Sequence, residues 1–199
     1  MKYEQRADEE KQNILEVVKN VIAQYVDNSE EISNEIINNF CTITPPETED
    51  IIQILMMRPS GVGGGSSIKP GNIWLDWKKL LIDGSESILT IAGVIAMPWL
   101  IPLAGLVIWN KVWSLLTIKI DERHAVVIWS MWKNKDNENH IENNKILSAV
   151  NSELTKYNRS LMNALELDGT LKDLEKMACI KKTDNEKWWL REWVKTVYI

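Results

Sequence analysis

The sequence predicts a mainly α protein with an N-terminal helical unit, one kinked apolar segment of the membrane type and a C-terminal α+β domain. Two observations lead to this fold class. Residues 88–109 form a run of 22 residues without a charged side chain, and apolar residues recur at helical spacing on both sides of that run. The expected boundaries are 1–57 for the acidic helical unit, 58–72 for a Gly/Ser/Pro linker, 73–87 for an amphipathic interfacial helix, 88–110 for the transmembrane-type segment and 116–199 for the C-terminal domain.

Composition and charge narrow the class of protein. Apolar residues make up 45% and charged residues 26% of the 199 residues, which is typical of a folded chain. The first 50 residues carry 12 acidic against 4 basic side chains, and such an acidic piece repels nucleic acid and anionic lipid. The first residues do not resemble a secretory signal, so we expect the N-terminal unit to be cytoplasmic at synthesis.

The N-terminal unit is expected to contain three helices. The first covers residues 7–26, where apolar residues recur at steps of three and four. A second begins at Ser29, which can act as the N-cap. A third should cover 45–57, because Thr44 and Glu47 can form a capping box around its first turn.

Residues 58–72 hold five of the nine glycines and predict a flexible tether. A phosphate-binding P-loop is the alternative interpretation. That motif needs Gly-Lys followed by Ser or Thr, whereas Ser66 follows Gly65 here, so the linker is preferred.

The tryptophans support a membrane border. Ten tryptophans stand against a single phenylalanine, and half of them lie in or beside the apolar segment. An indole combines an apolar ring with one polar edge, which suits the boundary between water and lipid. The expected membrane-interface residues are Trp74, Trp77, Lys78, Lys79, Trp109, Lys111 and Trp113.

The apolar segment is long enough to cross a membrane, but prolines interrupt it. As a helix, its 22 residues span roughly 33 Å against a hydrocarbon core of about 30 Å. Pro98 and Pro102 each remove a helical hydrogen bond, so we expect a kink there. The leading interpretation is a single-pass membrane protein whose soluble domains lie in the cytoplasm. A re-entrant hairpin and a buried core hairpin of a soluble protein are the alternatives.

The C-terminal part predicts a strand, three helices and a closing hairpin. The strand covers 116–120. The first helix begins at 121, and the second and third cover 141–154 and 165–177. The hairpin strands cover 179–183 and 188–194. Leu165, Leu167 and Leu171 are expected to face inward. This order, and above all the passage from the third helix into a charged hairpin over 171–187, resembles the winged-helix fold across about residues 116–197.

The resemblance implies DNA binding through the third helix, and the residues there do not favour it. That helix carries four acidic side chains against two lysines, and an acidic face beside phosphates lowers affinity. Lys181, Lys182 and Lys187 on the proposed wing are the possible nucleic-acid contacts. The winged-helix-like module is therefore expected to contact protein first and nucleic acid second.

No catalytic, cofactor-binding or metal-binding motif stands out. His124 and His140 are not at zinc-ligand spacing with Cys41 or Cys179, and both cysteines are expected to be reduced and buried. The leading hypothesis is a bacterial-type, membrane-anchored adaptor or regulatory subunit that is not an enzyme and recruits protein partners. A membrane-tethered DNA-binding transcriptional regulator and a pore-forming membrane effector are the alternatives.

Overall fold

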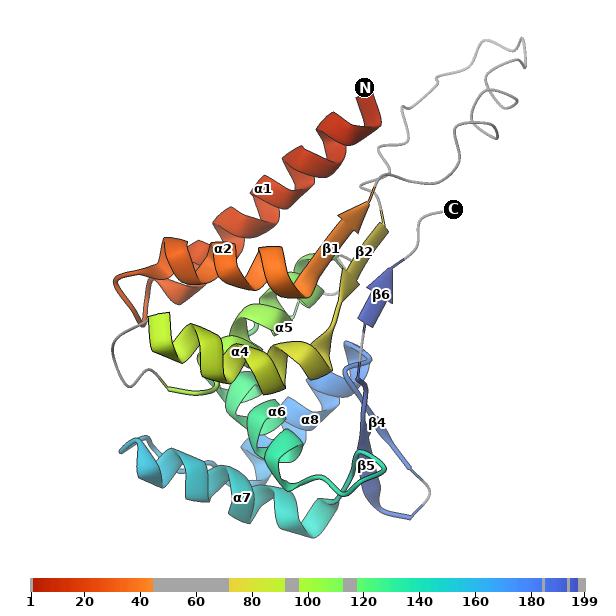
Figure 1. Cartoon of the computed structure of the whole chain (residues 1–199). Coiled ribbons are helices and arrows are strands. Elements are labelled where there is room, and N and C mark those ends of the chain that lie inside the picture. The colour runs from red at the N-terminus through yellow and green to blue at the C-terminus, as the bar shows by residue number, and fades with distance from the viewer. Residues whose placement is uncertain are drawn as a thin grey trace, which may run out of the picture.

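The computed structural model describes residues 2–44, 72–91, 97–112, 118–183, 185–192 and 194–196. Helices dominate it, and two small three-stranded sheets lie along one side of them (Figure 1). The helix expected over 45–57, the linker up to residue 71 and Trp113 lie outside the described residues.

The first two helices follow the apolar spacing of the sequence. Helix α1 covers Lys2–Ile22 and helix α2 covers Ser29–Phe40, and the two pack against each other. Ile14, Val18 and Ile22, four residues apart, are fully buried on one face of α1. The prediction of two helices is confirmed, although α1 lies over 2–22 rather than 7–26 and Asn28, not Ser29, is the N-cap of α2.

A strand replaces the start of the amphipathic helix expected over 73–87. Strand β2 (Asn72–Leu75) lies between β1 (Cys41–Thr44) and β6 (Val194–Thr196) and is antiparallel to both. Ile73 and Leu75 are buried while Trp74 between them is 37% exposed, so the burial alternates as in a strand. Helix α4 (Trp77–Ile91) begins only after Asp76, whose Oδ1 accepts a hydrogen bond from the backbone N–H of Lys79 (2.9 Å).

The apolar run does not form one kinked span. Its two described parts are the end of α4 and helix α5 (Leu100–Val112), and these helices pack against each other. The 13 residues of α5 are about 20 Å long. Within the described ranges, no helix combines the length and the apolar character that a bilayer crossing requires. The expectation of a single-pass membrane protein is therefore wrong.

The two prolines end up where a helix tolerates them. Pro98 is buried in the turn before α5, and Pro102 is the third residue of α5. A backbone N–H in the first turn has no carbonyl acceptor inside its own helix, so Pro102 removes no helical hydrogen bond. Leu103 N–H, one residue further, already donates to the carbonyl of Trp99 (2.9 Å). The expected kink at Pro98 and Pro102 is thus a helix start, and the buried hairpin is the alternative that agrees with this arrangement.

The C-terminal unit contains a helix, a strand, two helices and a hairpin. In chain order these are α6 (Glu122–Asn134), β3 (His140–Glu142), α7 (Asn143–Lys156), α8 (Ala164–Lys176), β4 (Ile180–Lys182) and β5 (Lys187–Leu190). The strands form an antiparallel sheet in the order β3-β5-β4.

The first strand of this unit is not where the sequence analysis expected it. Residues 118–120 are irregular, and β3 instead follows α6 at residues 140–142, where the helix expected over 141–154 was to begin. Asp136 makes the turn before β3 tight, because its Oδ1 accepts from the backbone N–H groups of Glu138 (3.0 Å) and His140 (2.8 Å). The predicted second hairpin strand is likewise divided into β5 and β6.

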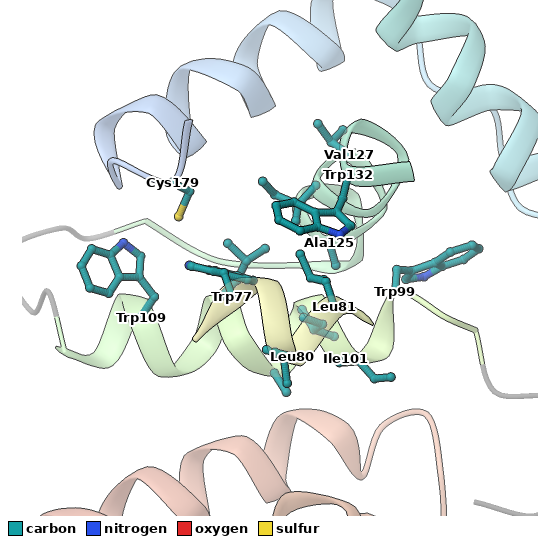
Figure 2. Close-up of a cluster of buried hydrophobic side chains, with 14 of the residues drawn as sticks. Trp77, Leu80, Leu81, Trp99, Ile101, Trp109, Ala125, Val127, Trp132 and Cys179 are labelled. Carbon is teal, nitrogen blue, oxygen red and sulfur yellow. The ribbon is translucent and has the colours of Figure 1, made fainter. Parts of the chain in front are cut away.

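One continuous core joins the N-terminal helices to the C-terminal unit. Figure 2 shows side chains of α4 (Trp77, Leu80, Leu81), α5 (Ile101, Trp109) and α6 (Ala125, Val127, Trp132) in a single buried cluster. The chain also returns to the N-terminal part, since β6 pairs with β2. Glu192 strengthens this connection, because its backbone O accepts from Lys78 N–H (2.9 Å) and its Oε1 from Lys78 Nζ (3.1 Å) and Asn139 Nδ2 (3.0 Å).

Candidate functional site

Two leucines at the start of α8 are the most exposed large apolar side chains of the described residues. Leu161 is 60% exposed and Leu165 is 82% exposed. Asn163 fixes this geometry through a capping box: its Oδ1 accepts from Glu166 N–H, and its own N–H donates to Glu166 Oε2, both at 2.9 Å. We refer to Leu161 and Leu165 as the α8 leucine pair.

Helix geometry explains why Leu165 faces solvent, contrary to the sequence analysis. Leu167, Leu171 and Leu174 are buried and form the inward stripe of α8. Leu165 precedes Leu167 by two residues, which is a rotation of about 200° around the helix. The Asn163–Glu166 capping box could have located the helix start in the sequence, and hence placed Leu165 off the stripe.

The outer face of α8 is acidic, as the sequence indicated, and most of its charges are paired. Lys172 binds Asp168 (2.6 Å), Lys176 binds Asp173 (3.3 Å) and Arg123 of α6 binds Glu166 (3.1 Å). The hydrogen bond to Asp168 raises the pKa of Lys172. The two lysines of α8 are therefore engaged within the protein rather than available to phosphates.

The possible nucleic-acid lysines do not act as one group. Lys181 and Lys182 are exposed on β4 and line a hollow of about 370 Å³ together with His140, Thr183 and Trp189. Lys187 is not among these lining residues, and its Nζ lies 3.9 Å from Asp136 Oδ2. We call the hollow formed by the other five residues the sheet hollow. His140 and Trp189 were not assigned to a site from the sequence.

The expected membrane-interface residues are divided between core and surface. Trp77 and Trp109 are each only 3% exposed, and Trp109 Nε1 donates to the carbonyl of Met177. Among the lysines, Lys78 pairs with Glu192 and Lys79 Nζ lies 5.8 Å from the centre of the Phe40 ring. The remaining described members, Trp74 and Lys111, are exposed. The two buried indoles are core residues in this arrangement.

A second polar hollow, of about 500 Å³, lies between α6 and α7. Glu153 is buried at its floor, and its Oε1 accepts from Lys156 (2.7 Å) and Lys133 (3.0 Å). Burial raises the pKa of Glu153. The hydrogen bonds from Lys156 and Lys133 lower this pKa by more than burial raises it, so the pKa lies below its ordinary value. This group is a satisfied buried carboxylate with a structural role, because it holds two lysines in place.

His124 takes part in a helix cap, and the two cysteines are buried in the core. Asp121 is the N-cap of α6 in a capping box: its Oδ1 accepts from His124 N–H (3.4 Å) and its own N–H donates to His124 Nδ1 (3.4 Å). The two side chains also meet directly, with Asp121 Oδ1 2.7 Å from His124 Nδ1. Cys41 and Cys179 are free and buried, as the sequence analysis expected. Burial raises the pKa of Cys41 to about 11, with a small opposing effect of Lys11, and also raises that of Cys179. Burial therefore favours the neutral thiol form of both cysteines at neutral pH.

A search for metal-binding geometry among the described residues finds no group of three or more His, Cys, Asp or Glu side chains that could hold an ion. Comparison with protein-family models, curated proteins and solved structures finds no match. The winged-helix resemblance of the C-terminal unit stays a prediction. Two surfaces of this unit, the α8 leucine pair and the sheet hollow, are the candidate sites of the described residues.

Proposed function

We propose that this protein is a non-catalytic adaptor or regulatory subunit that binds a partner protein through the α8 leucine pair. The observation that carries the proposal is the exposure of Leu161 and Leu165, which exceeds that of Ile82 (50%) and Trp74 (37%), the other exposed large apolar side chains of the described residues. Burying one leucine contributes roughly 1.5–3 kcal/mol, so a partner that covers both gains several kcal/mol from this patch. Exposed apolar patches mark protein–protein interaction sites, and the proposal treats these two leucines as such a patch.

The surroundings of the pair suggest what the partner surface looks like. Gly169, one turn after Leu165, has no neighbouring atom within 4 Å of the position of a Cβ, so the partner can approach the helix closely there. The acidic excess of α8 favours a partner that offers an apolar groove with basic residues at its rim. The same excess argues against duplex DNA as the ligand of this helix.

In-cell photo-cross-linking tests the proposal. A photo-reactive amino acid at position 165 should give a discrete cross-linked species, and the same residue at Asn137, an exposed turn position, serves as the control. The double variant Leu161→Ser/Leu165→Ser should lose the partner without a loss of thermal stability. Leu161→Met/Leu165→Met keeps the apolar area and should retain the partner.

Two results would contradict this function. One is equal cross-linking from positions 165 and 137. The other is full retention of the partner by the serine variant, which would show that the leucine pair contributes nothing to recognition.

A further inference from the structure

The sheet hollow has an aromatic floor fixed by strand register. Trp189 lies on the central strand β5, with His140 of β3 opposite it on one side and Lys181 of β4 on the other. Residues directly opposite each other across an antiparallel pair have Cβ atoms about 5 Å apart on the same face, so these three side chains form a row. Trp189 is half-buried in this row and lines the hollow.

The neighbouring tryptophan shows that Trp189 is not needed for the core. Trp188 points to the opposite face of the sheet, is 5% exposed, and donates from its Nε1 to Asn143 Oδ1 (2.9 Å). It pairs with Ile141 and lies in the hydrophobic core. Trp189, by contrast, places a large ring on the outer face, where its packing stabilises the fold less.

The charges of the hollow are polarised. Lys181 lies at one end of the row, whereas Lys182, which also lines the hollow, is paired in register with Trp188. Among the described residues neither of these lysines forms an ion pair, whereas Lys172, Lys176 and Lys187 all do. At the other end, His140 Nδ1 lies 3.8 Å from Asp136 Oδ1 and 3.9 Å from Glu138 Oε2. A ligand with an anion near Lys181, a flat ring over Trp189 and a hydrogen-bonding group near His140 matches the residues that line the hollow.

We propose that the sheet hollow binds a nucleotide, with the base stacked on Trp189 and the phosphate held by Lys181 and Lys182. Bases stack on exposed aromatic rings in a largely sequence-independent way, and lysines beside such a ring hold the backbone. The volume of about 370 Å³ is at the small end of ligand sites, which suits one base with its phosphate. An acidic peptide would satisfy the lysines, but it would leave the Trp189 ring unused.

The nucleotide is either free or part of a single strand, and both share this chemistry. The site is separate from the α8 leucine pair and independent of the proposed function. Variants of the leucine pair should therefore bind the nucleotide like the wild type, and failure of one proposal leaves the other standing.

The test uses the full chain, a short fluorescein-labelled single-stranded DNA at low salt, and unlabelled AMP as competitor. Trp189→Leu should weaken binding about 5- to 150-fold, because stacking on one base is worth about 1–3 kcal/mol. Trp189→Phe keeps a stacking ring and should retain most of the affinity. Lys181→Ala/Lys182→Ala should weaken binding and make the log–log salt slope shallower by about 1.4, as expected for two lost phosphate contacts.

Matched controls separate the site from general electrostatics. Lys172→Ala/Lys176→Ala removes the same charge from α8 and should leave binding unchanged. Displacement of the strand by AMP would assign the site to free nucleotides, and binding of the strand alone would assign it to nucleotides within a strand. The proposal is overturned by absence of binding at low salt, by equal losses in the control, by wild-type affinity of Trp189→Leu, or by a glutamate-rich peptide that competes as well as AMP and the strand.

Discussion

Helices α5 and α8 are each 13 residues long and rich in leucine, yet they use their apolar residues in opposite ways. Every residue from Leu100 to Trp109 is buried, because α5 is packed against α1, α4 and α6 at once. Helix α8 buries one stripe and leaves Leu165 almost fully exposed. Apolar character alone therefore does not define the role of a helix in this protein; the number of neighbouring elements does.

The largest expected effect is a matched leucine substitution in the two helices. Leu103→Ala in α5 removes a fully buried side chain and should lower the free energy of unfolding by about 2–5 kcal/mol, since both the transfer free energy and a cavity are involved. Leu165→Ala removes a side chain that is 82% exposed and should change it by less than about 0.5 kcal/mol. Urea unfolding followed by circular dichroism measures both; similar costs would break the distinction between the two helices.

The glycines of the same helices should respond with opposite signs. A Cβ at Gly105 in α5 would lie 2.7 Å from Leu80 Cδ2 and 3.0 Å from Trp77 Cζ3, and both side chains are buried. Gly105→Ala should therefore destabilise the protein by about 1–3 kcal/mol through overpacking. Gly169→Ala in α8 meets no atom within 4 Å and should stabilise it by about 0.5–1 kcal/mol.

Thermal or urea unfolding of the two alanine variants measures whether their stabilities change in opposite directions. Stabilisation by both substitutions would mean that α4 does not pack on α5 as closely as the distances at Gly105 require.

Local structure could be predicted from the sequence more accurately than the packing of the elements against one another. Helices α1, α2, α6 and α7 follow from apolar spacing and from caps such as Asp121, because these signals act within one or two turns. Whether residues 88–109 lie in a protein core or in a membrane depends on their packing against α1 and α6, which lie outside this stretch of sequence. An uncharged apolar run has the same sequence pattern in both environments.

Strand pairing was the other part that local signals could not supply. Strand β2 pairs with β1 and with β6, about 30 and 120 residues away, and its four residues are too short for a strand to be separated from a helix by periodicity. Of the candidate sites, Lys181 and Lys182 were found from the sequence because a charged hairpin is a local pattern. His140 was not, since only the register of β3 against β5 brings it to Trp189.

The smallest expected effect concerns the N-caps of α6 and α8. One is a carboxylate and the other is an amide. Asp121 caps α6 and titrates, whereas Asn163 caps α8 and does not. The hydrogen bond to His124 is the main reason that the pKa of Asp121 lies below its ordinary value. The unfolded chain therefore binds the proton more readily than the folded one, and the stabilisation is complete above the ordinary pKa and lost as the pH falls through the folded pKa.

Replacing each cap separates the titrating contribution from the hydrogen bond. Asp121→Asn keeps a good N-cap but removes the charge, so it should be less stable than the wild type at neutral pH, and the difference should shrink as the pH falls toward the folded pKa of Asp121. Asn163→Ala should cost about 1 kcal/mol with no comparable narrowing over the same range. Urea unfolding from about pH 7 to about pH 3 measures both differences. A gap between wild type and Asp121→Asn that stays constant with pH would mean that the Asp121 carboxylate stabilises α6 as an uncharged acceptor does, and that the two helix starts are equivalent.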